Sequence, residues 1–107
     1  MALALASIFA VTALFHAAAI VSPSLAPGAP GWRHGLFVAL NAAVAIGLLW
    51  RPPGFVAAFG VLTGQQVYSH GRDILDAWRT EARVDWMSVG VLVVMVGTLI
   101  ALAKRRV

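Results

Sequence analysis

The chain contains no cysteine, and only four of its 107 residues are acidic. Without cysteine there is no disulfide, no thiolate metal site and no cysteine nucleophile. Charged residues make up 11% of the chain and hydrophobic residues 61%, whereas soluble domains are about a quarter charged and about half apolar. The composition therefore excludes an ordinary soluble domain and indicates a membrane protein.

The net charge of +4 has two possible explanations, nucleic-acid binding or a membrane flank. A nucleic-acid footprint needs Lys and Arg gathered on one face. The only basic run is Lys104-Arg105-Arg106, which directly follows an apolar segment. A basic triplet in that place is typical of the end of a membrane span. We therefore expect the lipid bilayer, and no nucleic acid, as a partner.

Four apolar segments approach the roughly 20 residues that a helix needs to cross the hydrocarbon core. Backbone groups in lipid must be paired within the segment, which favours helices. The expected fold is an all-α integral membrane protein, a four-transmembrane-helix up-down-up-down bundle that forms one domain over residues 1–107. Its spans are expected at about residues 2–21, 34–50, 54–70 and 84–103.

The segments between the spans differ in character. Residues 22–31, SPSLAPGAPG, are expected to hold no regular structure because proline and glycine dominate them. Pro52 and Pro53 allow only a tight turn. Between the third and fourth spans, Ile74, Leu75 and Trp78 fall on one side of a charged stretch. That pattern predicts a short amphipathic segment at the membrane interface.

The orientation of the spans has to be taken from the basic residues that flank them. Four spans put both termini and Arg51 on one side of a cell membrane. The two sides then carry equal numbers of basic residues: Arg51, Lys104, Arg105 and Arg106 against Arg33, Arg72, Arg79 and Arg83. The dense C-terminal cluster favours cytoplasmic termini.

Polar side chains are concentrated in one half of the expected bundle. A polar residue within a span usually faces the protein interior or a wet cavity. We therefore predict a polar pocket that opens on the extracytoplasmic side and is lined by His16, Asn41, Gln66, His70 and Asp73. The simpler alternative is that these residues lie at headgroup level or form ordinary interhelical hydrogen bonds.

Three histidines and a nearby carboxylate raise the possibility of a metal or haem site. The candidate ligands are His16, His34, His70 and Asp73, and His16 with His70 is the candidate pair for a bis-histidine haem. Neither a His-x3-His nor a His-Glu-x-x-His motif is present. The spacing is thus not diagnostic of any metal.

No enzyme motif is present, since the sequence lacks Gly-x-Ser-x-Gly, a phosphate loop and paired carboxylates inside the spans. Three functional hypotheses remain. The chain is a non-catalytic subunit or accessory binding protein, a small oligomeric transporter, or a haem- or metal-binding redox protein. In length and span number it resembles the small multidrug exporters, a resemblance of outline that assigns no site residue. A homo-oligomer or a larger membrane complex is expected.

Overall fold

The computed structural model describes residues 1–105 and 107. Within these residues all regular structure is helical and no strand occurs. The α-helices are α1 (Ala2–Val21), α2 (Gly31–Trp50), α3 (Phe55–Glu81) and α4 (Trp86–Ala103), and a short 3₁₀ helix, η1 (Pro23–Leu25), follows α1. The prediction of an all-helical protein is confirmed. Arg106, the last residue of the expected basic triplet, lies outside the described residues.

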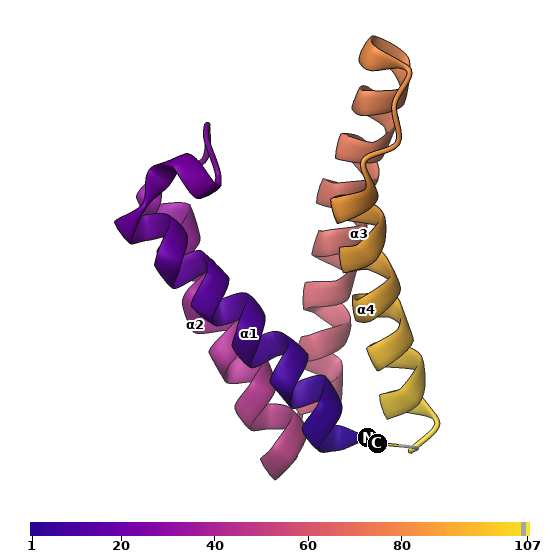
Figure 1. Ribbon diagram of the computed structural model, residues 1–107. Coiled ribbons are helices and arrows are strands. Elements are labelled where there is room, and N and C mark those ends of the chain that lie inside the picture. Colours follow the sequence, from indigo (N-terminus) through magenta and orange to yellow (C-terminus); the bar gives the residue numbers. More distant parts are fainter. Residues whose placement is uncertain (106) are drawn as a thin grey trace. The chain divides into compact units, whose positions relative to one another are not determined.

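The chain divides into two compact units, Met1–Pro52 and Pro53–Val107. We call them hairpin 1 and hairpin 2, because each consists of two long helices that pack side by side. Figure 1 shows α1 running along α2 in the first and α3 running along α4 in the second.

The sequence explains the turn within hairpin 1 and the turn between α2 and α3. In hairpin 1, η1 occupies part of the proline-rich linker, so the expectation that this linker holds no regular structure was wrong. Pro23 stands at the start of η1, where a fixed φ angle favours a helical turn and no N–H is needed. Helix α2 ends at Trp50, and its C-cap, Arg51, adopts the left-handed conformation (φ 55°) immediately before the two prolines. The turn is completed by Gly54 (φ 80°), where glycine avoids the strain that a Cβ would cause.

The buried side chains follow the helical period. On α1, Ala6, Phe9 and Ala13 are buried at spacings of three and four residues. On α3, Phe59, Thr63 and Gln66 follow the same spacing. Polar side chains therefore belong to the buried surface of hairpin 2, while small and aromatic residues dominate that of α1.

Three of the helices are long and apolar enough to cross a membrane: α1, α2 and α4. The boundaries expected for these spans are close to those observed, although α2 begins three residues early, at Gly31. Helix α3 does not reach the same apolarity, because it has two glutamines near its middle and a histidine and charged residues in its second half. The fold thus contains three helices whose length and composition are those of membrane-spanning helices.

Helix α3 is also longer than expected. It has 27 residues and continues without interruption through Gly71 to Glu81, so the amphipathic stretch around Trp78 is the last part of α3 and not a separate element. Figure 1 shows this end of α3 standing beyond the start of α4, with the connecting chain returning along it. The helix continues because residues 72–81 contain neither proline nor glycine and keep a helical pattern.

Candidate functional site

The polar side chains of hairpin 1 are organised around two histidines. His16 lies on α1, five residues before that helix ends, and His34 lies in the first turn of α2. Their Nδ1 atoms are 2.9 Å apart, a hydrogen-bond distance that requires one ring to donate and the other to accept. His34 is only 6% exposed. The partner of His16 is therefore the other histidine of the same hairpin.

Aromatic rings hold the His16 imidazole in place. The Phe37 ring stacks on it with centroids 5.3 Å apart and an angle of 22° between the planes. The Phe15 ring meets it edge-on at 5.6 Å. The guanidinium of Arg33 lies 5.9 Å from the centre of the Phe37 ring, so a fixed positive charge stands close to the pair. The two imidazoles thus lie between apolar rings, with one cation nearby and no acidic residue in hairpin 1.

Two further polar residues of hairpin 1, Asn41 and Thr12, bond to backbone carbonyls of their own helices. Asn41 donates from Nδ2 to the Phe37 carbonyl at 2.8 Å. Thr12 donates its hydroxyl to the Ile8 carbonyl at 2.9 Å. Bonds of this kind satisfy a polar group locally without linking two helices. Asn41 therefore makes no hydrogen bond to His16, and its place in a shared pocket stays a prediction.

Hairpin 2 has a polar link at the start of α4. His70 on α3 has its Nδ1 atom 2.9 Å from Oγ of Ser88 on α4, and Ser88 is completely buried. The Ser88 hydroxyl in turn lies 2.8 Å from Oδ2 of Asp85. Since a carboxylate only accepts, Ser88 donates to Asp85 and His70 donates its Nδ1 proton to Ser88. The result is a chain of hydrogen bonds from His70 through Ser88 to Asp85.

Asp85 also serves as the N-cap of α4. Its Oδ1 accepts the Ser88 backbone N–H at 3.1 Å, which satisfies one of the free donors at the helix start. This backbone hydrogen bond, followed by the bond from the Ser88 hydroxyl, lowers the pKa of the Asp85 carboxyl. Both bonds favour the charged form because they are made to the carboxylate. Asp85 is thus ionised at neutral pH and fixes the position of Ser88.

The other two residues predicted for hairpin 2 lie on either side of His70. Gln66 is buried and donates from Nε2 to Oε1 of Gln65 at 2.6 Å. Asp73 has its Oδ2 atom 3.8 Å from Nδ1 of His70, a distance too long for a hydrogen bond. The shared stripe predicted for Gln66, His70 and Asp73 is consistent with their places on the continuous helix α3.

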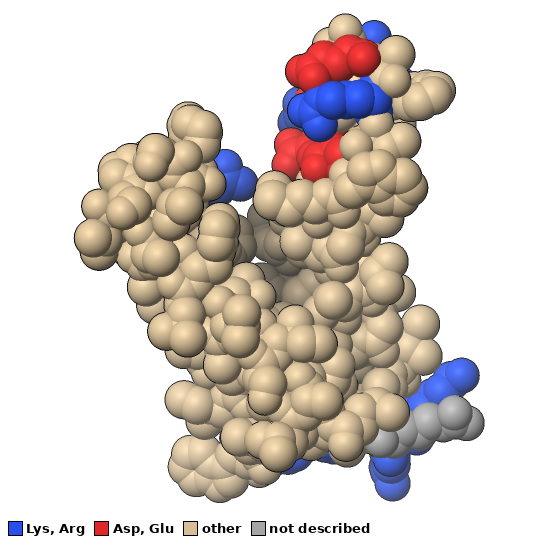
Figure 2. Space-filling model, in the orientation of Figure 1, with Lys and Arg blue, Asp and Glu red and all other residues tan. Residues whose placement is uncertain are grey.

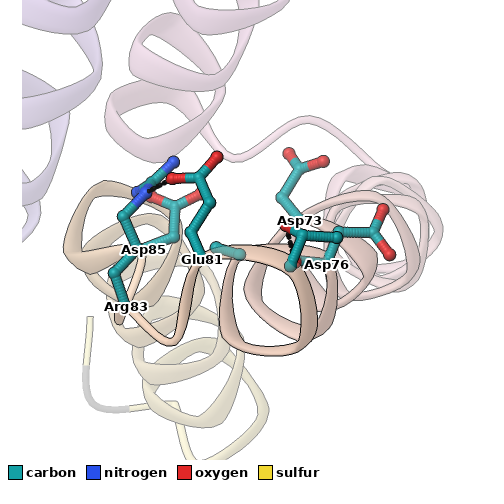
Figure 3. Close-up of a pocket in the computed structure, with 7 residues that line it drawn as sticks. Asp73, Asp76, Glu81, Arg83 and Asp85 are labelled. Atoms are coloured by element: carbon teal, nitrogen blue, oxygen red, sulfur yellow. Dashed lines mark hydrogen bonds and ion pairs between the residues drawn. The ribbon is translucent and has the colours of Figure 1, made fainter.

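All four acidic residues of the chain line one open pocket of about 290 Å³ between the end of α3 and the chain that leads into α4. Figure 3 shows Asp73 and Asp76 on α3, and Glu81, Arg83 and Asp85 where the chain turns back. Arg83 forms an ion pair with Glu81, which raises the pKa of the Arg83 guanidinium. Figure 2 shows these acids gathered with basic residues at the projecting end of α3. The pocket is a charged, solvent-exposed surface.

The described part of the chain contains no group of three or more His, Asp or Glu side chains close enough to hold a metal ion. The four candidate ligands fall in two places. His16 and His34 form a pair in hairpin 1, and His70 lies near Asp73 in hairpin 2. The candidate haem ligands His16 and His70 thus belong to different hairpins, and each has a hydrogen-bond partner inside its own.

Sequence reasoning missed two features of this arrangement. It paired neither Ser88 with His70 nor His34 with His16. In both hairpins the hydrogen bond between helices joins residues 18 positions apart. That common separation, measured across the turn of each hairpin, is the sequence signal that could have identified both pairs.

The fold and these polar links define a small all-helical protein whose apolar helices suggest a membrane location. Comparison with protein-family models, with curated proteins and with solved structures finds no match for this chain. A proposal for its function therefore rests on the residues and their geometry.

Proposed function

We propose that this chain is a four-span membrane protein of the cell membrane, a non-catalytic subunit or accessory protein that binds a partner or a small polar ligand at one polar end. The observation that carries the proposal is the pair of histidine-centred links. His16–His34 joins the helices of hairpin 1, and His70–Ser88 joins those of hairpin 2.

The two links lie at the same distance from the apolar ends of their helices. His16 is about 14 residues from the start of α1, His34 and His70 are about 16 and 15 residues from the α2–α3 turn, and Ser88 is about 15 residues from the end of α4. At a rise of ~1.5 Å per residue, each lies roughly 21–24 Å along its helix. If all four helices cross, the four side chains occupy one level of the membrane.

The fourth crossing requires α3 to span as well. Its 27 residues give a length of about 40 Å, close to the ~40–45 Å of a bilayer with its headgroups. Helix α3 can cross despite its low apolarity because some of its polar side chains are buried against protein: Thr63 and Gln66 are only 3% and 5% exposed. Polar side chains that face protein rather than lipid are tolerated within a span.

An even number of crossings puts both termini on the same side of the membrane, and the dense basic cluster at the C-terminus favours the cytoplasmic side. The polar links then lie towards the extracytoplasmic face, on the side of η1 and of the charged end of α3. Arg51, Lys104 and Arg105 lie on the opposite, cytoplasmic face with both termini. Both faces carry the same number of basic residues, so the dense C-terminal cluster, and not the count, supports this orientation.

The burial and hydrogen bonding of Ser88 favour a binding role over catalysis. Its hydroxyl group is fully buried and donates its proton to Asp85 in a hydrogen bond, so it is not placed to attack a substrate. His70 correspondingly donates to Ser88 and does not act as its base, the reverse of the arrangement that activates a serine nucleophile.

Water access to the polar end is tested by single cysteines, because the natural chain contains none. Ser69→Cys, at a half-buried position next to His70, should react with a membrane-impermeant thiol reagent added outside intact cells. Leu62→Cys, two turns nearer the apolar end of α3 and also half-buried, is the matched control and should remain unlabelled. Equal protection of both variants would contradict a wet pocket at this end.

The number of chains in the assembly provides the second test. Native mass spectrometry of the protein released from lipid nanodiscs should give a particle larger than one 11.3 kDa chain. A subunit or homo-oligomer requires such a particle. A single chain under conditions that retain bound lipid would contradict this part of the proposal.

A further inference from the structure

We propose that His16 and His34 chelate one transition-metal ion of the copper(II) or nickel(II) class through their Nδ1 atoms. The inference rests on the proposed function in one respect: the polar end must be open to water for an ion to reach the pair. It needs no residue of hairpin 2, because both ligands belong to hairpin 1.

The distance between the two nitrogens suits a particular coordination geometry. Imidazole nitrogens lie about 2.0–2.1 Å from such a metal ion. Two ligands at that distance are about 2.9 Å apart when the angle at the metal is near 90°, and about 3.3 Å apart when it is tetrahedral. The Nδ1 atoms of His16 and His34 are 2.9 Å apart. Neighbouring positions of a square-planar or octahedral ion fit this spacing, which favours copper(II) or nickel(II) over zinc.

The proton between the rings does not prevent chelation. In the hydrogen-bonded pair, one ring carries its proton on Nδ1 and donates it to the other. When an ion binds, that proton moves to Nε2 of the same ring, so both Nδ1 lone pairs become available and both imidazoles stay neutral. Each ring turns so that its lone pair meets the ion. The broad energy wells of such terminal torsions allow this rotation.

The surroundings determine the rest of the coordination. Among the described residues, no further His, Asp or Glu completes a group of three, so water or an added ligand must occupy the other positions. The Arg33 guanidinium, which lies over the neighbouring Phe37 ring, opposes the charge of the ion. Removing this charge should strengthen binding, a result that a merely structural histidine pair would not produce.

The test uses the full chain without an affinity tag, reconstituted in lipid nanodiscs and titrated with copper(II) alone. We expect one ion per chain, with an electron paramagnetic resonance spectrum split by two imidazole nitrogens. His16→Leu and His34→Leu should each weaken binding at least about tenfold. His70→Leu, which removes a histidine from hairpin 2, is the matched control and should leave the affinity unchanged.

Two further measurements make the outcome decisive even where a leucine variant loses its fold. Arg33→Gln leaves both histidines in place and should tighten copper(II) binding several-fold. Copper binding that is absent, that persists in both leucine variants, or that weakens in Arg33→Gln overturns the inference. Labelling of Ser69→Cys separates the two proposals: an accessible cysteine without copper binding defeats the metal site alone, and an inaccessible one defeats the wet pocket.

Discussion

His70 on α3 and Ser88 on α4 are joined by an Nδ1–Oγ hydrogen bond of 2.9 Å in which the serine is completely buried. It is the polar link between the two helices of hairpin 2, and the Asp85 carboxylate extends it to the start of α4. Removing this buried hydroxyl takes away the hydrogen-bond partner of His70 Nδ1 and one of the two donors to Asp85, which keeps the backbone N–H of residue 88.

The first prediction follows from this arrangement. Ser88→Ala should lower the free energy of unfolding by about 0.5–2 kcal/mol, the range of interhelical hydrogen bonds in membrane proteins. Ser7→Ala is the matched control, because Ser7 is exposed and bonds only to the Leu3 carbonyl of its own helix. Steric-trap unfolding in bicelles measures both. Equal effects of the two substitutions would contradict the link.

Acid should weaken the start of α4. The pKa of Asp85 is lowered in the folded chain by the Ser88 backbone N–H and hydroxyl, so its charged form is stabilised. That stabilisation is fully present above the ordinary pKa of an aspartate, about 3.9, and is lost as the pH falls through the lowered value. The difference in unfolding free energy between the wild type and Asp85→Asn should therefore shrink between about pH 5 and pH 3. A difference that stays constant over this range would refute the role of the charge.

A stabilising substitution is expected inside α3. Gly71 lies within the helix, and a Cβ at this position meets no other atom within 4 Å. Gly71→Ala should therefore raise the free energy of unfolding by about 0.5–1 kcal/mol, because alanine loses less backbone freedom than glycine in a helix. The same unfolding measurement tests it. If α3 instead ended near Gly71, alanine would give no gain.

The sequence was sufficient to predict the helical fold and most helix boundaries. Long apolar runs separated by proline and glycine leave few alternatives to helices joined by turns. The Pro52-Pro53 pair identifies one of these turns from the sequence alone. The end of α3 was harder to predict. The glycine and the charged residues after His70 resemble a helix that stops, yet the stretch retains helix-forming residues and the helix reaches Glu81.

The partners of the polar residues could not be obtained from single-helix patterns. Residues that share a stripe on one helix are visible in the sequence, as Gln66 and His70 are. The neighbours of His16 depend on how far α2 is shifted along α1, which is set by the packing of residues such as Phe9 and by the linker between the helices. The histidine pair is thus a product of helix packing.

That pair can be observed directly. In the chain labelled with ¹⁵N-histidine, nuclear magnetic resonance should detect a nitrogen–nitrogen coupling across the hydrogen bond between Nδ1 of His16 and Nδ1 of His34. His70 supplies an internal control, because its Nδ1 bonds to an oxygen. The coupling should disappear in His34→Leu. Its absence from the wild-type spectrum at a pH where both rings are neutral would contradict the pair.

The central claim is that α3 crosses the membrane with α1, α2 and α4, so that the polar links of both hairpins lie towards one face. Single cysteines at Ser24 and at Val107 test it in sealed vesicles with an impermeant thiol reagent. Four crossings place Ser24 and Val107 on opposite sides, so only one of the two variants should be labelled from outside. If α3 does not cross, three crossings put both positions on the same side. Labelling of both variants from the same side would therefore contradict the account.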